Sequence, residues 1–310
     1  MVISMIKNIS NNLFNYATSE LSQDAFICYL CSFAIKGNDN NKVLYNCAIE
    51  FINLMLPDNN KLKMGEYLDT DENYQPIMQQ YNNIDVLICA KGFKIIIEDK
   101  TFTGLHDDQI NKYKKSLLDQ GVSADKICTV YYKIIEQSNT ENVDFEFNRN
   151  KLLDLFNTYY SDANDKIFTD YVDYLKKIDN SVNDYNKSIV EWETNQYIGF
   201  FNFLKSERLI DDGYWQAGWG YVPNQTGGFM GMWWSPKSIN NLYNSCKGEL
   251  YIQIEANRIV LKIYNDDLNK EMSEDEQEQI INARYRFKNE LDAFIKDEKY
   301  DVKRMGCIKI

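Results

Sequence analysis

The stretch IDVLICAKGFKIIIEDK, residues 84–100, holds two apolar runs separated by Lys91 and Gly92. Runs rich in Ile and Val that flank a two-residue turn containing Gly are typical of a β-hairpin. In such a hairpin the first residues of one strand lie beside the last residues of the other. The sequence therefore predicts that Asp85 and Glu98 are neighbours across the strand pair.

Charged residues interrupt the apolar pattern at the open end of this hairpin. Side chains alternate along a strand, so we expect Glu98 and Lys100 on one face and Asp99 on the other. Burying these charges as ordinary core would be costly, whereas carboxylate oxygens are the ligands of hard divalent cations. A neighbouring Lys can stabilise charge that develops on a phosphate. The alternative is a solvated Glu98–Lys100 pair at the rim of the sheet.

Helical and strand patterns surround the hairpin in a definite order. Apolar spacing predicts helices near residues 21–33, 44–55 and 107–119. We expect further strands over residues 61–69 and 126–134. The first part of the chain is therefore predicted to be α/β, with the order helix, three strands, helix, strand.

The sequence pattern changes in the second part of the chain. We therefore divide the whole chain into a first region, residues 1–180, and an α+β region, residues 181–310. The predicted elements here are helices at 165–178 and 190–204, a Gly- and Trp-rich β segment at 214–234, a hairpin at 249–264, a helix opened by Ser273 and Glu276, and a last strand at 305–310. The tryptophans of the β segment are expected to form the core of a small sheet. A stacking surface for bases is the alternative.

Composition excludes several classes of protein. The 46 acidic and 34 basic residues give a net charge of −12, which excludes a generally basic nucleic-acid-binding surface but permits a local basic groove. The lysines at positions 91, 94, 112, 114 and 115 are expected to form either such a rim or an ordinary solvated face. The only histidine, His106, excludes a metal centre built from several histidines, and no phosphate-binding P-loop motif occurs.

Localisation is predicted from what the sequence lacks. No apolar run approaches the ~20 residues of a membrane helix, and no secretory signal is visible. Of the seven cysteines, Cys28 and Cys31 lie close together in an apolar segment, but no second pair accompanies them to complete a metal site. The cysteine pattern predicts free thiols in a reducing cytoplasm. The lack of a long apolar run predicts that the protein has no membrane partner.

The pattern Asp85-x12-Glu98-x-Lys100 resembles the core motif of the PD-(D/E)XK nuclease superfamily. The following helix carries Gln109-x3-Tyr113, which is similar to the Q-x3-Y element of RecB-type nucleases. Upstream, the segment ELSQDAF at residues 20–26 looks like the acidic start of the first core helix in one bacterial branch of the superfamily. The sequence departs from the motif in having Ile84 in place of the Pro of the family name, and Pro is not a ligand. Asp99 stands where many members have an apolar or small residue.

This resemblance implies a fold and a set of roles. The fold is a restriction-endonuclease-like αβββαβ core over residues 1–180, followed by a C-terminal accessory or regulatory region over residues 181–310. Asp85, Glu98 and the backbone carbonyl of Asp99 would bind Mg²⁺ or Mn²⁺, and Lys100 would orient or activate the attacking water. Glu20 would add a further carboxylate, with Asp24 as its competitor on the same helix face. Gln109 would bond near the metal or the scissile phosphate, and Tyr113 would support Lys100 or a phosphate.

The function implied is a metal-dependent nuclease that hydrolyses phosphodiester bonds, in DNA rather than RNA, with a role in bacterial defence against foreign DNA such as viral DNA. Two alternatives stay open, a catalytically idle nuclease fold used for binding and an effector switched by a ligand or partner. A protein partner or small ligand is expected at the C-terminal region. The sequence leaves open whether an endonuclease or an exonuclease is present, and it leaves the oligomeric state open.

Overall fold

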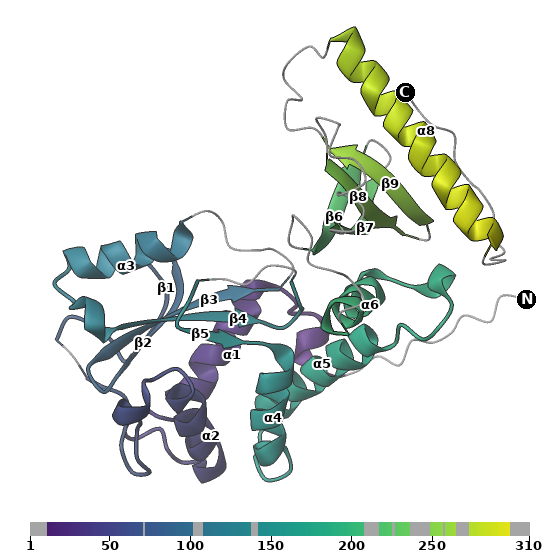
Figure 1. Cartoon of the computed structure of the whole chain (residues 1–310). Coiled ribbons are helices and arrows are strands. Elements are labelled where there is room, and N and C mark those ends of the chain that lie inside the picture. Colours follow the sequence, from purple (N-terminus) through teal and green to yellow (C-terminus); the bar gives the residue numbers. More distant parts are fainter. Residues whose placement is uncertain are drawn as a thin grey trace, which may run out of the picture. The chain divides into compact units, whose positions relative to one another are not determined.

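A computed structural model describes residues 11–70, 72–101, 108–137, 142–207, 217–224, 227–235, 249–256, 258–264 and 273–297 (Figure 1). The chain divides into two compact units, Met1–Ser188 and Ile189–Ile310. The predicted boundary between residues 180 and 181 lies inside the continuous helix α5 (Lys166–Asn183). His106, Trp215 and the predicted strand at 305–310 lie outside the described residues.

The first unit is built on a five-stranded mixed sheet with the strand order β1-β2-β3-β4-β5. The strands are β1 (Ile77–Tyr81), β2 (Ile84–Ala90), β3 (Phe93–Lys100), β4 (Ile127–Lys133) and β5 (Phe145–Phe147). Strand β2 runs antiparallel to both of its neighbours, β1 and β3, whereas β4 is parallel to β3 and β5 is parallel to β4. The order helix, three strands, helix, strand is confirmed, and so is the mixed α/β class.

The β2–β3 hairpin forms as the sequence predicts. Lys91 and Gly92 both have positive φ, 54° and 76°, as a tight two-residue turn between twisted strands requires. Val86 pairs with Ile97, and every residue of β3 is buried. Strand β3 of the hairpin is therefore the central strand of the sheet. The charged residues that β3 carries at the open end of the hairpin are buried.

The predicted first strand over residues 61–69 is wrong. That segment is irregular and turns at Gly65, whose φ of 91° is left-handed. The Lys61 ammonium donates to the carbonyl oxygen of Leu56 at 2.6 Å, which holds the segment against the end of the preceding helix. The first strand is instead β1, which lies at the edge of the sheet and, among the described strands, pairs with β2 alone.

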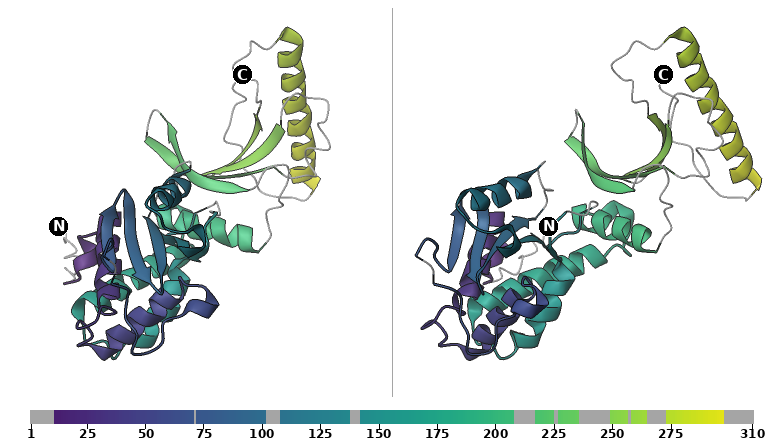
Figure 2. Two further views of the ribbon diagram at one scale, coloured as in Figure 1. Left: turned by 90° about the vertical axis from the view of Figure 1, so that its left-hand side faces the viewer. Right: turned by 60° about the vertical axis from the view of Figure 1, so that its left-hand side comes forward.

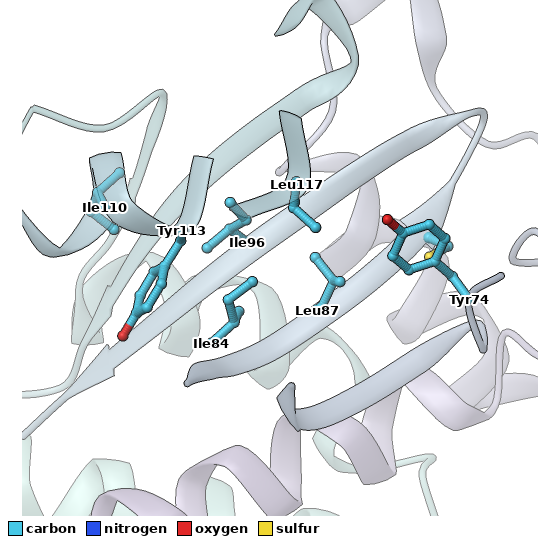
Figure 3. Packing of buried hydrophobic residues seen from close by; sticks show 8 residues of the cluster. Tyr74, Ile84, Leu87, Ile96, Ile110, Tyr113 and Leu117 are labelled. Carbon is cyan, nitrogen blue, oxygen red and sulfur yellow. The ribbon is translucent and has the colours of Figure 1, made fainter. Parts of the chain in front are cut away.

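Helices cover both faces of this sheet (Figures 1 and 2). They are α1 (Glu20–Ser32), α2 (Lys42–Asn53), α3 (Gln109–Asp119), α4 (Arg149–Tyr160) and α5, with short 3-10 helices η1 (Leu13–Asn15), η2 (Asp58–Asn60) and η3 (Ala124–Lys126). Among the described helices, α3 is the one that packs on one face, and Figure 3 shows its residues Tyr113 and Leu117 beside Ile84, Ile96 and Leu87 of the sheet. Helices α1, α2, α4 and α5 pack against one another on the other face.

Arg149 is the largest fully buried side chain of this unit. Its guanidinium donates to Glu136 through two nitrogens at 2.7 and 2.9 Å, to Asp179 at 3.0 Å and to the Ile134 carbonyl at 2.8 Å. It therefore joins α4, α5 and the segment after β4.

We expect Arg149→Ala to lower the free energy of unfolding by about 3–5 kcal/mol, because it leaves two carboxylates without their buried partner. Urea unfolding of the full chain measures this loss. Arg149→Lys keeps the charge but loses the two-pronged geometry, so it should recover only part of the stability. A loss below about 1 kcal/mol for the Ala variant would show that the network does not stabilise the fold.

The second unit holds a four-stranded antiparallel sheet in the order β6-β7-β8-β9, drawn in green in Figure 2. Its elements are η4 (Ile189–Glu191), α6 (Thr194–Ser206), β6 (Gly218–Asn224), β7 (Gly227–Trp234), β8 (Glu249–Glu255), β9 (Arg258–Tyr264) and α8 (Glu274–Asp297). The predicted β segment, the second hairpin and the long helix after Ser273 are confirmed. This part of the chain is α+β, as expected.

The described tryptophans of this sheet pack within the unit. Trp219 is 7% exposed and Met232 beside it is fully buried. A Cβ atom added at Gly218 would lie 3.0 Å from the indole nitrogen of Trp233, so that ring rests on the bare backbone of the neighbouring strand. This packing favours the core interpretation over a base-stacking surface.

Candidate active site

The paired carboxylates come from the open end of the β2–β3 hairpin. Because Val86 lies opposite Ile97, the register continued one step outward places Asp85 opposite Glu98, and the two carboxyl groups interact. The backbone N–H of Asp99 donates to Asp85 Oδ2 at 3.0 Å, which fixes the carboxylate against β3. The predicted adjacency is confirmed.

Lys100 completes this group from the same face of β3. Its ammonium nitrogen lies 2.5 Å from Glu98 Oε1, and the two residues are 7% and 0% exposed. Ile96 lies on the same face of β3 as Glu98 and Lys100, and it packs in the apolar cluster under α3. The predicted shared face is confirmed, and the solvated-rim alternative is wrong because both side chains are buried.

Helix α3 brings two polar side chains to this face. Gln109 Nε2 donates to Glu98 Oε1 at 2.7 Å and to the Tyr113 hydroxyl at 2.6 Å, one turn further along the helix. Glu98 Oε1 therefore accepts from both Lys100 and Gln109. The structure brings Gln109 into direct contact with a predicted metal ligand, and Tyr113 bonds to Gln109 beside the same carboxylate.

The two competing acids of α1 contact residues at different strands of the sheet. Glu20 Oε1 accepts from the backbone N–H of Thr101 at 3.0 Å. Asp24 is 1% exposed, and its Oδ2 accepts from Gln80 Nε2 at 3.0 Å. The same Gln80 nitrogen donates to Asp85 Oδ1 at 3.2 Å, so Asp24 is linked to the carboxylate pair through one shared amide. Gln80 was not predicted as a site residue, because no motif or apolar periodicity in this short polar edge strand distinguishes it from its neighbours.

Asp99 points to the opposite face, as the strand alternation predicts. It is fully buried, and its Oδ1 accepts from Gln23 Nε2 of α1 at 3.3 Å. Gln23 also donates to the Thr101 hydroxyl at 2.8 Å and accepts from the Tyr171 hydroxyl at 3.1 Å, which bonds in turn to Tyr132. The Asp99 side chain thus joins β3 to α1 and α5, and only its backbone carbonyl remains for the predicted cation contact.

Burial makes these carboxyl groups hard to ionise. Burial raises the pKa of Glu98 to about 7, with repulsion from Asp85 added and the hydrogen bond to Lys100 opposing it. Burial, followed by repulsion from Asp85, raises the pKa of Asp24 to about 7. Burial likewise raises the pKa of Asp99 well above its usual range. The site therefore holds more negative groups than it can ionise together at neutral pH without a further positive charge.

Lys100 stays an ammonium. Burial alone would lower its pKa, but its hydrogen bond to Glu98 and the attraction of Glu98, Asp85 and Glu20 outweigh burial and raise the pKa of Lys100. A lysine with a raised pKa is protonated at neutral pH, so it donates hydrogen bonds and does not act as a base.

Unsatisfied oxygens test whether a cation fits this group. Two buried oxygens near this group lack a hydrogen-bond partner, Glu98 Oε2 and Asp24 Oδ1, and the third such carboxylate oxygen, Asp99 Oδ2, lies on the opposite face of the sheet. Within the described ranges, no three Asp, Glu, Cys or His side chains are gathered into one metal-holding cluster. Mg²⁺ commonly uses only one or two carboxylates and keeps several waters. The Asp85–Glu98 pair meets that requirement, so the residues present fit a hydrated divalent cation.

The lysines of the predicted basic rim have different environments. Lys112 and Lys115 are exposed on α3. Lys91 is paired with Glu66 at 3.0 Å, and Lys94 is buried with its ammonium 4.0 Å above the Tyr74 ring. Any basic surface near the site therefore comes from α3 and not from the hairpin.

Comparisons with protein families, with curated proteins and with solved structures found no match to this chain. In the part of the chain that the structure describes, no helix has the length and apolar character needed to cross a membrane.

We expect Asp24→Asn to stabilise the cation-free protein at pH 8 by roughly 2–4 kcal/mol. The pKa of Asp24 is about 7 in the fold and 3.8 without it. The folded state therefore binds more protons between these values, and its stability falls as the pH rises from about 4 to about 7. Urea unfolding at pH 4 and pH 8 with EDTA measures the effect. The variant should match wild type at pH 4, and equal stability at pH 8 would contradict the prediction.

Proposed function

We propose that this chain is a metal-dependent nuclease with a PD-(D/E)XK-type site at Asp85, Glu98 and Lys100. The observation that carries the proposal is the direct contact of Glu98 with both Lys100 and Gln109, beside Asp85, at the buried end of one hairpin. Four buried or half-buried polar residues from two strands and a helix converge there. Burying them costs stability, and such a cost is typical of a functional site.

The topology supports a restriction-endonuclease-like core. An antiparallel set of three strands precedes α3, and the strand that follows α3 pairs in parallel with the strand before it. The acidic helix α1 contacts the residue after β3 through Glu20, and it contacts Gln80 of β1 through Asp24. This strand pairing and the contacts of α1 support a core with the αβββαβ order, in which α1 and the β2–β3 hairpin contribute to one site.

The protein groups have separate roles in the proposed hydrolysis. Asp85, Glu98 and the backbone carbonyl of Asp99 would hold Mg²⁺ or Mn²⁺, which when bound supplies Lewis acidity and a more acidic water. The Lys100 ammonium donates to the phosphate or the attacking water and stabilises the negative charge of the transition state. Gln109 orients the Glu98 carboxylate by donating a hydrogen bond to one of its two oxygens. Tyr113 holds the Gln109 amide in that orientation.

DNA is the proposed substrate, and defence against foreign DNA is the proposed role. Both follow the resemblance of the motif. The acidic net charge of −12 favours contact through a limited surface such as α3, where Lys112 and Lys115 are exposed. The second unit is proposed to bind a protein partner or a small ligand that sets substrate choice or control.

Cleavage assays test the proposal. Purified full-length protein is incubated with closed circular DNA, linear duplex, single-stranded DNA and RNA, each with Mg²⁺, Mn²⁺ or EDTA. We expect metal-dependent cleavage of DNA that EDTA abolishes, and opening of closed circles would establish endonuclease action. Folded protein that cleaves none of these substrates with either metal would contradict the proposal and favour a binding role.

A further inference from the structure

Gln80 has a backbone conformation that its place in the fold does not require. Its φ is 53°, in the left-handed region. The turn between β1 and β2 already uses Asn82 and Asn83, with φ of 51° and 67°, so Gln80 lies within the strand and outside the turn. It falls between the pairs Gln79–Val86 and Tyr81–Ile84, which places it opposite Asp85. A left-handed non-glycine residue costs about 1–3 kcal/mol and persists where its surroundings fix it.

The Gln80 side chain shows what its position achieves. Its amide nitrogen carries two hydrogens, and it donates one bond to Asp24 at 3.0 Å and one to Asp85 at 3.2 Å. These carboxylates come from α1 and β2, which are far apart in the sequence. The amide is neutral, so it holds two like charges near each other without neutralising either.

The remaining acceptor positions of both carboxylates are left for other ligands. The second oxygen of Asp24, Oδ1, is buried and lacks a partner. The second oxygen of Asp85 accepts from the Asp99 N–H, and an ionised carboxylate has about four lone-pair positions in all. Asp85 is thus held from two sides, by Gln80 and by the β3 backbone, and retains free acceptor capacity.

We propose that Gln80 is a positioning residue for the cation site, because its amide holds the Asp24 and Asp85 carboxylates in one arrangement before the cation arrives. This inference rests on the proposed metal-dependent function. A partner that orients a ligand in this way typically contributes 10–100-fold to metal affinity. Gln80 would act through Asp85 and would not touch the substrate.

The test compares Gln80→Gly with Gln79→Ala in the full chain. Glycine adopts the left-handed backbone without strain, so this variant removes the amide and keeps the fold. Gln79 is the adjacent exposed residue on the same strand, and its amide donates at 3.4 Å to the Leu21 carbonyl and not to a carboxylate. Calorimetric titration with Mn²⁺ measures affinity, thermal unfolding measures the fold, and cleavage at varied Mg²⁺ separates KM for the metal from kcat.

For Gln80→Gly we expect about 10-fold weaker Mn²⁺ binding, with unfolding at or above the wild-type temperature. The KM for Mg²⁺ should rise by a similar factor, with kcat at saturating metal within about 3-fold of wild type. Gln79→Ala should match wild type throughout. Equal or tighter Mn²⁺ binding by Gln80→Gly would overturn the inference while leaving the nuclease proposal intact. A folded wild-type protein that neither binds Mn²⁺ nor cleaves would overturn both.

Discussion

Lys100→Ala is expected to lower the rate of DNA cleavage by about 10²–10³-fold, the loss typical of removing one donor to a developing negative charge. Lys100 is 7% exposed, and its ammonium nitrogen lies 2.5 Å from Glu98 Oε1. Its raised pKa keeps it charged at neutral pH. Single-turnover cleavage at saturating Mg²⁺ measures the loss.

Lys94→Ala is the matched control. Lys94 lies on the same strand and the same face and is also 7% exposed, but its ammonium is placed over the Tyr74 ring at the far end of β3. Its loss should reduce stability and leave cleavage near the wild-type rate. Cleavage by folded Lys100→Ala at the rate of Lys94→Ala would show that Lys100 has no part in the reaction.

Asp85→Asn is expected to weaken Mn²⁺ binding by at least about 100-fold and to abolish cleavage. Loss of a direct ligand should exceed the 10–100-fold cost of losing a group that only orients one. Asparagine keeps the size, and its single side-chain oxygen can still accept from the Asp99 N–H, although its NH2 group cannot accept from Gln80. The backbone contact to β3 is kept, so the hairpin should stay folded. Calorimetric titration with Mn²⁺ measures the affinity.

Asp165→Asn is the control for this substitution. Asp165 caps α5 by accepting from the Phe168 N–H at 2.9 Å, and asparagine is an equally good capping residue. This variant should bind Mn²⁺ as wild type does. Wild-type affinity in folded Asp85→Asn would contradict the assignment of Asp85 as a ligand.

The sequence predicts the centre of the site well because its geometry is local. One two-residue turn at Lys91 and Gly92 fixes the register of β2 and β3, and that register alone places Asp85 opposite Glu98. Strand alternation then separates Lys100 from Asp99. The helical spacing of Gln109 and Tyr113 is local too, so their shared face could be predicted.

The parts that depend on distant segments could not be predicted. Edge strand β1 exposes Gln79 and Gln80, so it lacks the apolar alternation that marks a buried strand. Leu62 and Met64 alternate with lysines in segment 61–69, and this pattern predicts a strand there instead. The helix α4 and the short strand β5 were not predicted either. The choice between Glu20 and Asp24 depends on how α1 packs, and Gln80 contributes only through a left-handed backbone that no sequence pattern signals.

A crystal structure of the full chain grown with Mn²⁺ tests the central claim most directly, because anomalous scattering locates manganese without assumptions about the protein. We predict one strong anomalous peak in contact with carboxylate oxygens of both Asp85 and Glu98, at roughly 2.0–2.3 Å. Soaked crystals of Asp85→Asn should lose that peak. Manganese bound elsewhere, or carboxylates of Asp85 and Glu98 that point to opposite faces of the sheet, would contradict the claim.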